Sequence, residues 1–105
     1  MEPLTRVTAS TIDVLSALLD HDGPAWGLLV IKATGRPAGT VYPILERLEQ
    51  RGWIASSWED DDARPGPRRR MYEYTPDGRA AALDARAAFR RRAPQRRPSG
   101  RVVTP

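Results

Sequence analysis

Arginine is the side chain through which this sequence can do most of its chemistry. The 105 residues include 17 basic and 13 acidic side chains, which gives a formal net charge of +4, and Lys32 is the only lysine. Guanidinium groups donate paired hydrogen bonds to phosphates and to guanine edges, so an arginine-rich surface favours a polyanionic partner. A codon bias toward arginine in a GC-rich genome explains the same composition equally well.

Residue types that carry catalysis or bind metals are sparse and poorly spaced. His21 is the only histidine, and there is no cysteine with which it could share a metal ion. The acidic residues from Glu59 to Asp62 are consecutive, which is typical of an exposed turn rather than of a calcium loop. No Ser-His-Asp arrangement has a recognisable spacing. The sequence therefore predicts a protein that is not an enzyme and that needs no metal or cofactor.

Three segments with apolar residues at three- and four-residue spacing predict helices. They span Thr8 to His21, Ala25 to Ala33 and Ala38 to Arg51. The first ends at Asp22-Gly23-Pro24, and a tight turn, Thr34 to Pro37, separates the second from the third.

The third predicted helix has the clearest division into two faces. Its predicted buried stripe consists of Val41, Ile44, Leu45 and Leu48. Pro43 lacks a backbone N–H, so we expect the regular part of the helix to begin near Thr40.

A change of period follows the third helix. Trp53 to Glu59 and Arg70 to Thr75 alternate and contain aromatic residues, which predicts a β-hairpin with a long polar tip. Thr75-Pro76-Asp77-Gly78 then predicts the start of a last helix, with Thr75 as N-cap and an end near Arg92. The residues beyond Pro94 are rich in arginine, proline and serine, which favours disorder.

This order of elements is that of a winged helix-turn-helix, in which the third helix enters the major groove and the hairpin reaches adjacent phosphates. We expect a mainly α fold with a small β-hairpin, in the order α-α-α-β-β-α. The expected organisation is an N-terminal arm (1–7), a winged helix-turn-helix domain (8–75), a C-terminal dimerisation helix (76–92) and a basic disordered tail (93–105).

Two motifs resemble those of the PadR family of transcriptional regulators. Residues 39–49, GTVYPILERLE, followed by Gly52-Trp53-Ile54, are similar to the family's signature, and residues 69–79, RRMYEYTPDGR, are similar to a second stretch. The resemblance covers residues 8 to 92 and implies a homodimer that binds a palindromic operator on double-stranded DNA, usually as a repressor. The single C-terminal helix makes this a short form, and the sequence does not identify a small-molecule effector.

The motif positions and the arginines supply the candidate site. The predicted DNA-binding residues are Arg36, Ala38, Gly39, Thr40, Tyr42, Arg47, Arg64, Arg68 and Arg69. Leu15, Ala80, Leu83 and Ala87 are the predicted dimerisation residues. Each of three residues has an alternative to DNA contact. Tyr42 could pack in the core, Arg47 could form a surface pair with nearby glutamates, and Arg36 could simply be solvated. We expect Trp26, Trp53 and Trp58 to pack in the core or an interface, with a ligand pocket as the alternative.

A second class of function remains open, because some winged helices bind proteins and not DNA.

No apolar run approaches the roughly 20 residues of a membrane span, since the longest is Leu28 to Ile31. The N-terminus also lacks the apolar segment of a signal peptide, so we expect a cytoplasmic protein without membrane contact.

Overall fold

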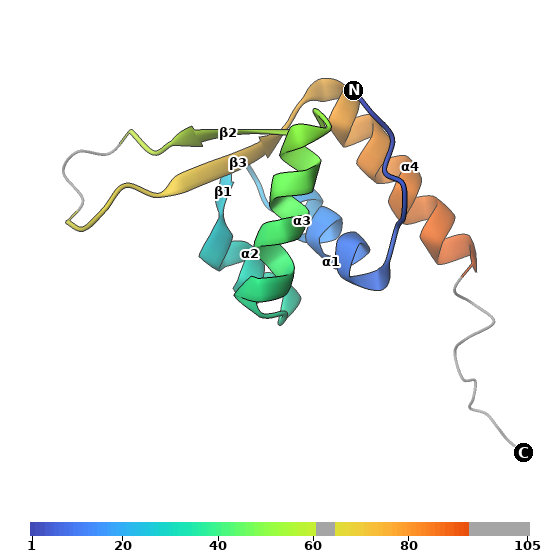
Figure 1. Cartoon of the computed structure of the whole chain (residues 1–105), viewed down its shortest axis with the longest axis horizontal. Coiled ribbons are helices and arrows are strands. Elements are labelled where there is room, and N and C mark those ends of the chain that lie inside the picture. Colours follow the sequence, from blue (N-terminus) through green and yellow to red (C-terminus); the bar gives the residue numbers. More distant parts are fainter. Residues whose placement is uncertain (61–64, 93–105) are drawn as a thin grey trace, which may run out of the picture.

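The structure is a computed structural model, and it describes residues 1–60 and 65–92. These residues form four helices and a small three-stranded sheet, which confirms the predicted fold class (Figure 1). In chain order the elements are α1 (Ala9–Asp20), β1 (Ala25–Trp26), α2 (Gly27–Thr34), α3 (Ala38–Gln50), β2 (Ile54–Trp58), β3 (Arg70–Tyr74) and α4 (Pro76–Arg92).

Helix α1 begins where its sequence supplies a cap. The Thr8 hydroxyl accepts a hydrogen bond from the Thr11 backbone N–H at 3.2 Å, which satisfies one of the free donors of the first turn. The helix buries Ile12, Val14, Leu15, Leu18 and Leu19 in the core. Leu15 is fully buried inside the subunit, so its predicted role in dimerisation is wrong: it has no surface to offer a partner.

Strand β1 is an element that the helical spacing did not predict. Ala25 and Trp26 pair with Tyr72 and Met71 of β3, so α2 begins at Gly27 and not at Ala25. Trp26 keeps an extended backbone and acts as the N-cap residue of α2. The observed order is therefore α-β-α-α-β-β-α. A two-residue strand has no period of its own, and its partner lies more than 40 residues further along the chain.

Helix α3 begins at Ala38, as the apolar spacing predicted, although Pro43 was expected to delay its regular part to Thr40. The Pro37 carbonyl accepts hydrogen bonds from the N–H groups of Thr40 and Val41, at 2.9 and 3.0 Å, so the first turn closes at Ala38. Pro43 lies in the second turn and leaves the Gly39 carbonyl without its usual i+4 donor. Both residues are exposed, so solvent can satisfy that carbonyl. The predicted stripe of α3 is confirmed, because all four of its residues are buried.

Strands β2 and β3 form the predicted hairpin, which projects from the body of the molecule (Figure 1). Ser56 lies opposite Tyr72, and Trp58 lies opposite Arg70. The sheet order is β1-β3-β2, so β3 occupies the centre. Trp53 precedes β2 instead of belonging to it, and its indole is 4% exposed, in the core.

Helix α4 lies on the side of the molecule opposite the hairpin (Figure 1) and packs against α1. Thr75 caps it as predicted, since its hydroxyl accepts a hydrogen bond from the Gly78 N–H at 3.0 Å. A Cβ atom on Gly78 would overlap the Trp53 carbonyl, so glycine is required at this close approach. Two interactions hold α4 and the end of β3 to α1: the Tyr74 hydroxyl donates to the Leu15 carbonyl at 2.7 Å, and Arg86 pairs with Asp20 at 3.1 Å.

Candidate nucleic-acid interface

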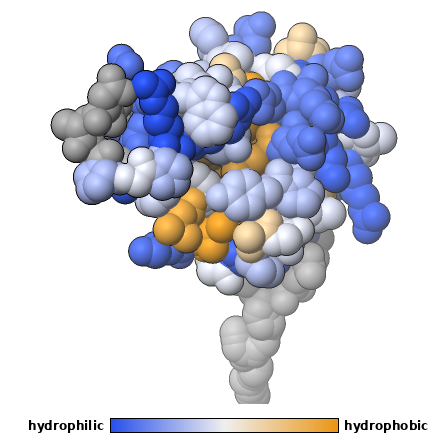
Figure 2. Space-filling model, turned by 60° about the vertical axis from the view of Figure 1, so that its left-hand side comes forward, coloured by the Kyte–Doolittle hydropathy of each residue, from blue (hydrophilic) through white to orange (hydrophobic). Residues whose placement is uncertain are grey.

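The outer face of α3 is exposed along the whole helix. Its exposed residues are Ala38, Gly39, Tyr42, Pro43, Glu46, Arg47 and Gln50. Thr40 is half-buried at the edge of this face. Figure 2 shows that hydrophilic residues dominate the side of the molecule that carries the hairpin, with hydrophobic surface confined to small areas. A helix held by one buried stripe and open on the other side has the shape that enters a major groove.

The start of α3 is free of side-chain caps. Pro37 occupies the N-cap position and makes no side-chain hydrogen bond, and no acidic residue lies in the first turn. The N–H groups of Ala38 and Gly39 and the positive end of the helix dipole therefore face outward without local compensation. Such a helix start attracts a phosphate oxygen.

Tyr42 is neither a core residue nor a freely rotating surface residue. It is 45% exposed, yet its ring lies directly over Gly27, where a Cβ atom would overlap the ring. The first residue of α2 thus fixes the orientation of the Tyr42 ring. The structure excludes core packing for this side chain and leaves its predicted contact with DNA as a prediction.

Arg36, in the turn between α2 and α3, is engaged inside the subunit. Its Nε donates to Asp13 Oδ2 of α1 at 2.7 Å, and its backbone N–H donates to the Thr34 hydroxyl at 3.1 Å. The side chain is about one-third exposed. This ion pair holds the turn in front of α3, so plain solvation does not describe Arg36.

The arginines of the hairpin differ from one another. Arg69 is half-buried, and its guanidinium stacks on the Trp26 ring at 3.8 Å from the ring centre. Its backbone pairs with Glu59, where the Glu59 N–H donates to the Arg69 carbonyl at 2.7 Å. Arg68 is exposed, and Arg64 lies outside the described residues. The stack on Trp26 was not predicted, because these two residues are far apart in the sequence.

Glu49 connects α3 to the hairpin. Its carboxylate accepts a hydrogen bond from the Ser56 hydroxyl and lies 3.5 Å from Arg70, which in turn lies over the Trp58 ring at 5.2 Å. Glu49 belongs to the family signature, but the sequence alone predicted no role for it. These interactions fix the angle between the hairpin and α3, and only the fold brings the partners together.

The two tyrosines of β3 are uncharged parts of this framework. Burial raises the pKa of Tyr74 far above its ordinary value, and burial also raises the pKa of Tyr72. Both hydroxyls therefore stay protonated near neutral pH and add no negative charge beside the arginines.

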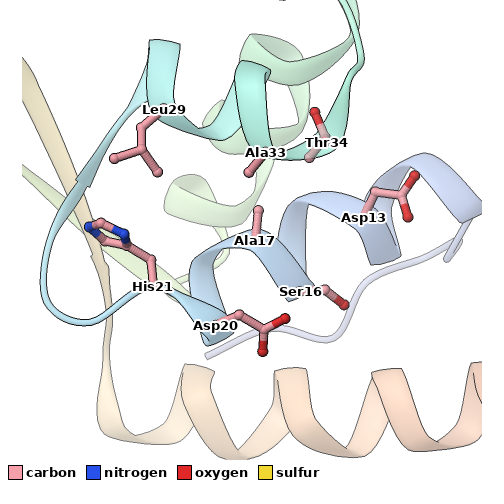
Figure 3. A pocket seen from close by; sticks show the side chains of 8 residues that line it. All are labelled: Asp13, Ser16, Ala17, Asp20, His21, Leu29, Ala33 and Thr34. Atoms are coloured by element: carbon pink, nitrogen blue, oxygen red, sulfur yellow. The ribbon is translucent and has the colours of Figure 1, made fainter.

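A hollow between α1 and α2 has the wrong charge for a nucleic acid. It has a volume of about 380 Å³, and Asp13 and Asp20 line it together with His21 (Figure 3). The two carboxylates pair with Arg36 and Arg86, respectively. No cluster of metal-ligating side chains occurs among the residues that the structure describes. Phosphate binding is therefore expected at α3 and the hairpin and not here.

The predicted dimerisation residues of α4 lie on its outer face. Ala80, Leu83 and Ala87 are exposed, and Leu83 is 41% exposed. The opposite face of α4 packs against the core through Gly78, Ala82 and Phe89.

No helix in the described part of the chain is long and apolar enough to span a membrane.

Comparisons with known proteins agree with this architecture. The sequence profile of the transcriptional regulator PadR-like family matches residues 15–84. No curated protein sequence matches the chain.

Among solved structures, BpsR of Bordetella bronchiseptica, whose DNA binding is regulated by 6-hydroxynicotinic acid, is 32% identical, with a TM-score of 0.72 over 99% of this chain and 73% of BpsR. A PadR family transcription regulator of Clostridium difficile is 22% identical, with a TM-score of 0.68 over 84% of this chain and 97% of that one. A PadR-like transcription factor of Bacteroides fragilis is 24% identical, with a TM-score of 0.61 over 80% of this chain and 84% of that one. The last two similarities show the fold alone.

The family profile covers two-thirds of the chain, including α3 and the hairpin, and the family consists of transcriptional regulators and not of enzymes. The chain therefore belongs to the PadR-like family of DNA-binding transcriptional regulators.

Proposed function

We propose that this regulator is a homodimeric repressor that binds a palindromic operator. One observation carries the proposal: α3 presents an exposed, uncapped start beside a hairpin that bears arginines. The start of α3 faces the base edges in the major groove, and the hairpin lies along the flanking phosphates.

The proposal assigns different roles to the candidate residues. Ala38, Gly39, Thr40 and Tyr42 approach the bases and the nearest phosphate. Arg47, Arg64 and Arg68 contact phosphates, while Arg36 and Arg69 act mainly by holding the turn and the hairpin in place, because each is already engaged with Asp13 or Trp26. In this arrangement residues 8–75 bind DNA and residues 76–92 serve the dimer.

The outer face of α4 supports a dimer. Exposed Leu83 lies between exposed Ala80 and Ala87 on the same side of the helix, and small residues allow a second helix to approach closely. A two-fold dimer places two copies of α3 in successive major grooves, so it reads a palindrome. A protein bound near a promoter blocks transcription, and it acts in the cytoplasm, where the chromosome lies.

The test has two steps. First, fragments of the parent genome that the protein retains are sequenced to define the operator. Second, the affinity for that operator and for a scrambled duplex is measured over a range of salt concentrations. We expect a steep fall of affinity with salt on both duplexes and much tighter binding to the operator. Retention of no preferred fragment, with no salt-dependent binding, would favour a protein-interaction module instead.

A further inference from the structure

A second groove lies along α3, on the flank away from the hairpin. It has a volume of about 480 Å³ and runs between the N-terminal segment, the start of α1 and α3. Arg6 and Arg47 line it together with the hydroxyl residues Thr5, Ser10 and Thr40, and none of its lining residues is acidic. The hollow between α1 and α2 contains two aspartates, so the charge of the second groove sets it apart.

The two arginines of this groove are available to a ligand. Arg6 and Arg47 are both exposed, and neither forms an ion pair with any residue within 1–60 and 65–92. The surface pair between Arg47 and a neighbouring glutamate, an alternative at the sequence level, is therefore not formed in these residues. Glu49 instead pairs with Arg70 on the other flank of α3.

Arg6 is held beside α3 although it belongs to the N-terminal arm. The Trp53 indole N–H donates to the Glu2 carbonyl at 2.6 Å, and the Arg51 guanidinium donates to the Pro3 carbonyl at 2.8 Å. On the other side, Thr8 caps α1. Residues 5 and 6 thus form a short link between two anchored points, which limits the entropy cost of ordering Arg6 on a ligand.

The position of the groove around α3 decides which ligand it fits. Arg47 and Glu49 lie roughly 160° apart around the helix, so the groove and the hairpin lie on opposite flanks. The major groove is about 12 Å wide, close to the diameter of a helix with its side chains, and its two walls are phosphate backbones. A helix seated there meets one backbone on each flank.

We propose that Arg6 and Arg47, assisted by the Thr5, Ser10 and Thr40 hydroxyls, form a phosphate site for the DNA backbone on the flank of α3 opposite the hairpin. The proposal rests on the proposed DNA-binding function. It gives the N-terminal arm a direct role in DNA binding. The hairpin and the arm contact the two phosphate backbones on either side of the same major groove.

The test uses Arg6→Gln, Arg47→Gln and the double variant in the full chain, with Lys32→Gln as control, because Lys32 is an exposed basic residue of α2 that does not line the groove. Thermal melts confirm that each variant is folded. We expect each groove variant to bind operator and scrambled DNA several-fold more weakly. The salt slope should fall by about 0.9 for each phosphate that the variant no longer neutralises. The control should match the wild type.

Two further experiments identify whether the phosphate belongs to DNA or is a free anion. Neutral methylphosphonate linkages placed one at a time along the operator should weaken the wild type at the flanking backbone and leave the double variant unaffected at the same position. Free inorganic phosphate at constant ionic strength should not stabilise the wild type more than the double variant.

Three outcomes overturn the proposal. If the DNA affinity of the wild type falls steeply with salt and all groove variants behave like the control, the groove is not part of the interface. The proposed function then still stands. If free phosphate selectively stabilises the wild type while DNA affinity is unchanged in the variants, the site takes a free anion. If the wild type shows no salt-dependent binding at all, the proposed function fails together with the groove.

Discussion

The arginines of this protein divide into two groups that their sequence context does not separate. Arg36, Arg69 and Arg70 are engaged with Asp13, Trp26 and Glu49, respectively. Arg6 and Arg47 are exposed and form no ion pair in the described residues. Composition predicted a polyanion-binding surface, but the engaged arginines depend on partners that only the fold brings close. An arginine that holds the site in place affects DNA binding through geometry, whereas an exposed one without an ion pair acts through charge.

The stack of Arg69 on Trp26 should be worth a measurable coupling energy. We expect Arg69→Ala and Trp26→Leu each to lower the free energy of unfolding. The loss of unfolding free energy in the double variant should be smaller than the sum of the two single losses. The difference should be about 0.5–1 kcal/mol, because either substitution alone already removes the cation–π interaction. Urea unfolding of the four proteins measures this, with Arg90→Ala, an exposed arginine of α4, as the control. Strictly additive effects would mean that the stack contributes nothing.

At the scale of elements, the spacing of apolar residues predicted the helices well. It did not predict the two-residue strand β1 or the effect of Pro43 on α3. The stripe of α3 follows from its spacing alone, because a single amphipathic helix contains all the information. The first turn of α3 is closed locally by the Pro37 carbonyl, although Pro43 was expected to delay the regular helix to Thr40. Strand β1 was missed because it depends on a partner elsewhere in the chain, namely β3 for Ala25 and Trp26. The interactions of Arg36 and Glu49 were missed for the same reason.

Gly78 is required where α4 begins. Gly78→Ala should lower the free energy of unfolding by about 1–3 kcal/mol, because the new methyl group overlaps the backbone carbonyl of Trp53, which cannot rotate away. Gly39→Ala is the matched control, since a Cβ atom there meets open space and alanine favours a helix by about 0.5–1 kcal/mol. Thermal melts in the absence of DNA compare the two. Equal stability of Gly78→Ala and wild type would contradict the close approach.

Tyr74 should make the fold sensitive to alkaline pH. Its pKa is raised by burial above the ordinary value of 10.0, so the folded protein keeps the proton where the unfolded chain has released it. The stabilisation is complete below pH 10 and is lost as the pH rises above it. Tyr74→Phe should cost about 1 kcal/mol at neutral pH by removing the hydrogen bond to the Leu15 carbonyl, but its stability should fall less steeply above pH 10. Parallel pH profiles of the two proteins would rule this out.

The whole molecule presents its two proposed surfaces on different sides. The hairpin projects at one end, α3 occupies the middle, and α4 lies at the other end (Figure 1). A partner on α4 therefore leaves α3 and the hairpin open. The sequence predicted both surfaces in outline, but it assigned Leu15 to the dimer because helical spacing cannot tell a core face from an interface face.

Leu83 should control assembly. Leu83→Glu places a charge in the proposed interface, so the dimer should dissociate while the subunit stays folded, since the side chain is already 41% exposed. Analytical ultracentrifugation gives the molecular mass, and Ala55→Glu on the exposed face of β2 controls for the added charge. A wild type that is monomeric while binding its operator tightly would contradict the dimer.

The most direct test of the central claim is the ratio of operator to scrambled-DNA affinity in Tyr42→Phe and Thr40→Ala. Tyr42→Phe keeps the ring packed over Gly27 and removes only the hydroxyl, so the fold should be unchanged in thermal melts. If the start of α3 faces the base edges, the ratio should fall about fivefold or more, because removing a base interaction costs roughly 1–3 kcal/mol at the operator and less on other sequences. Folded variants with the wild-type ratio would show that this end of α3 does not read the operator.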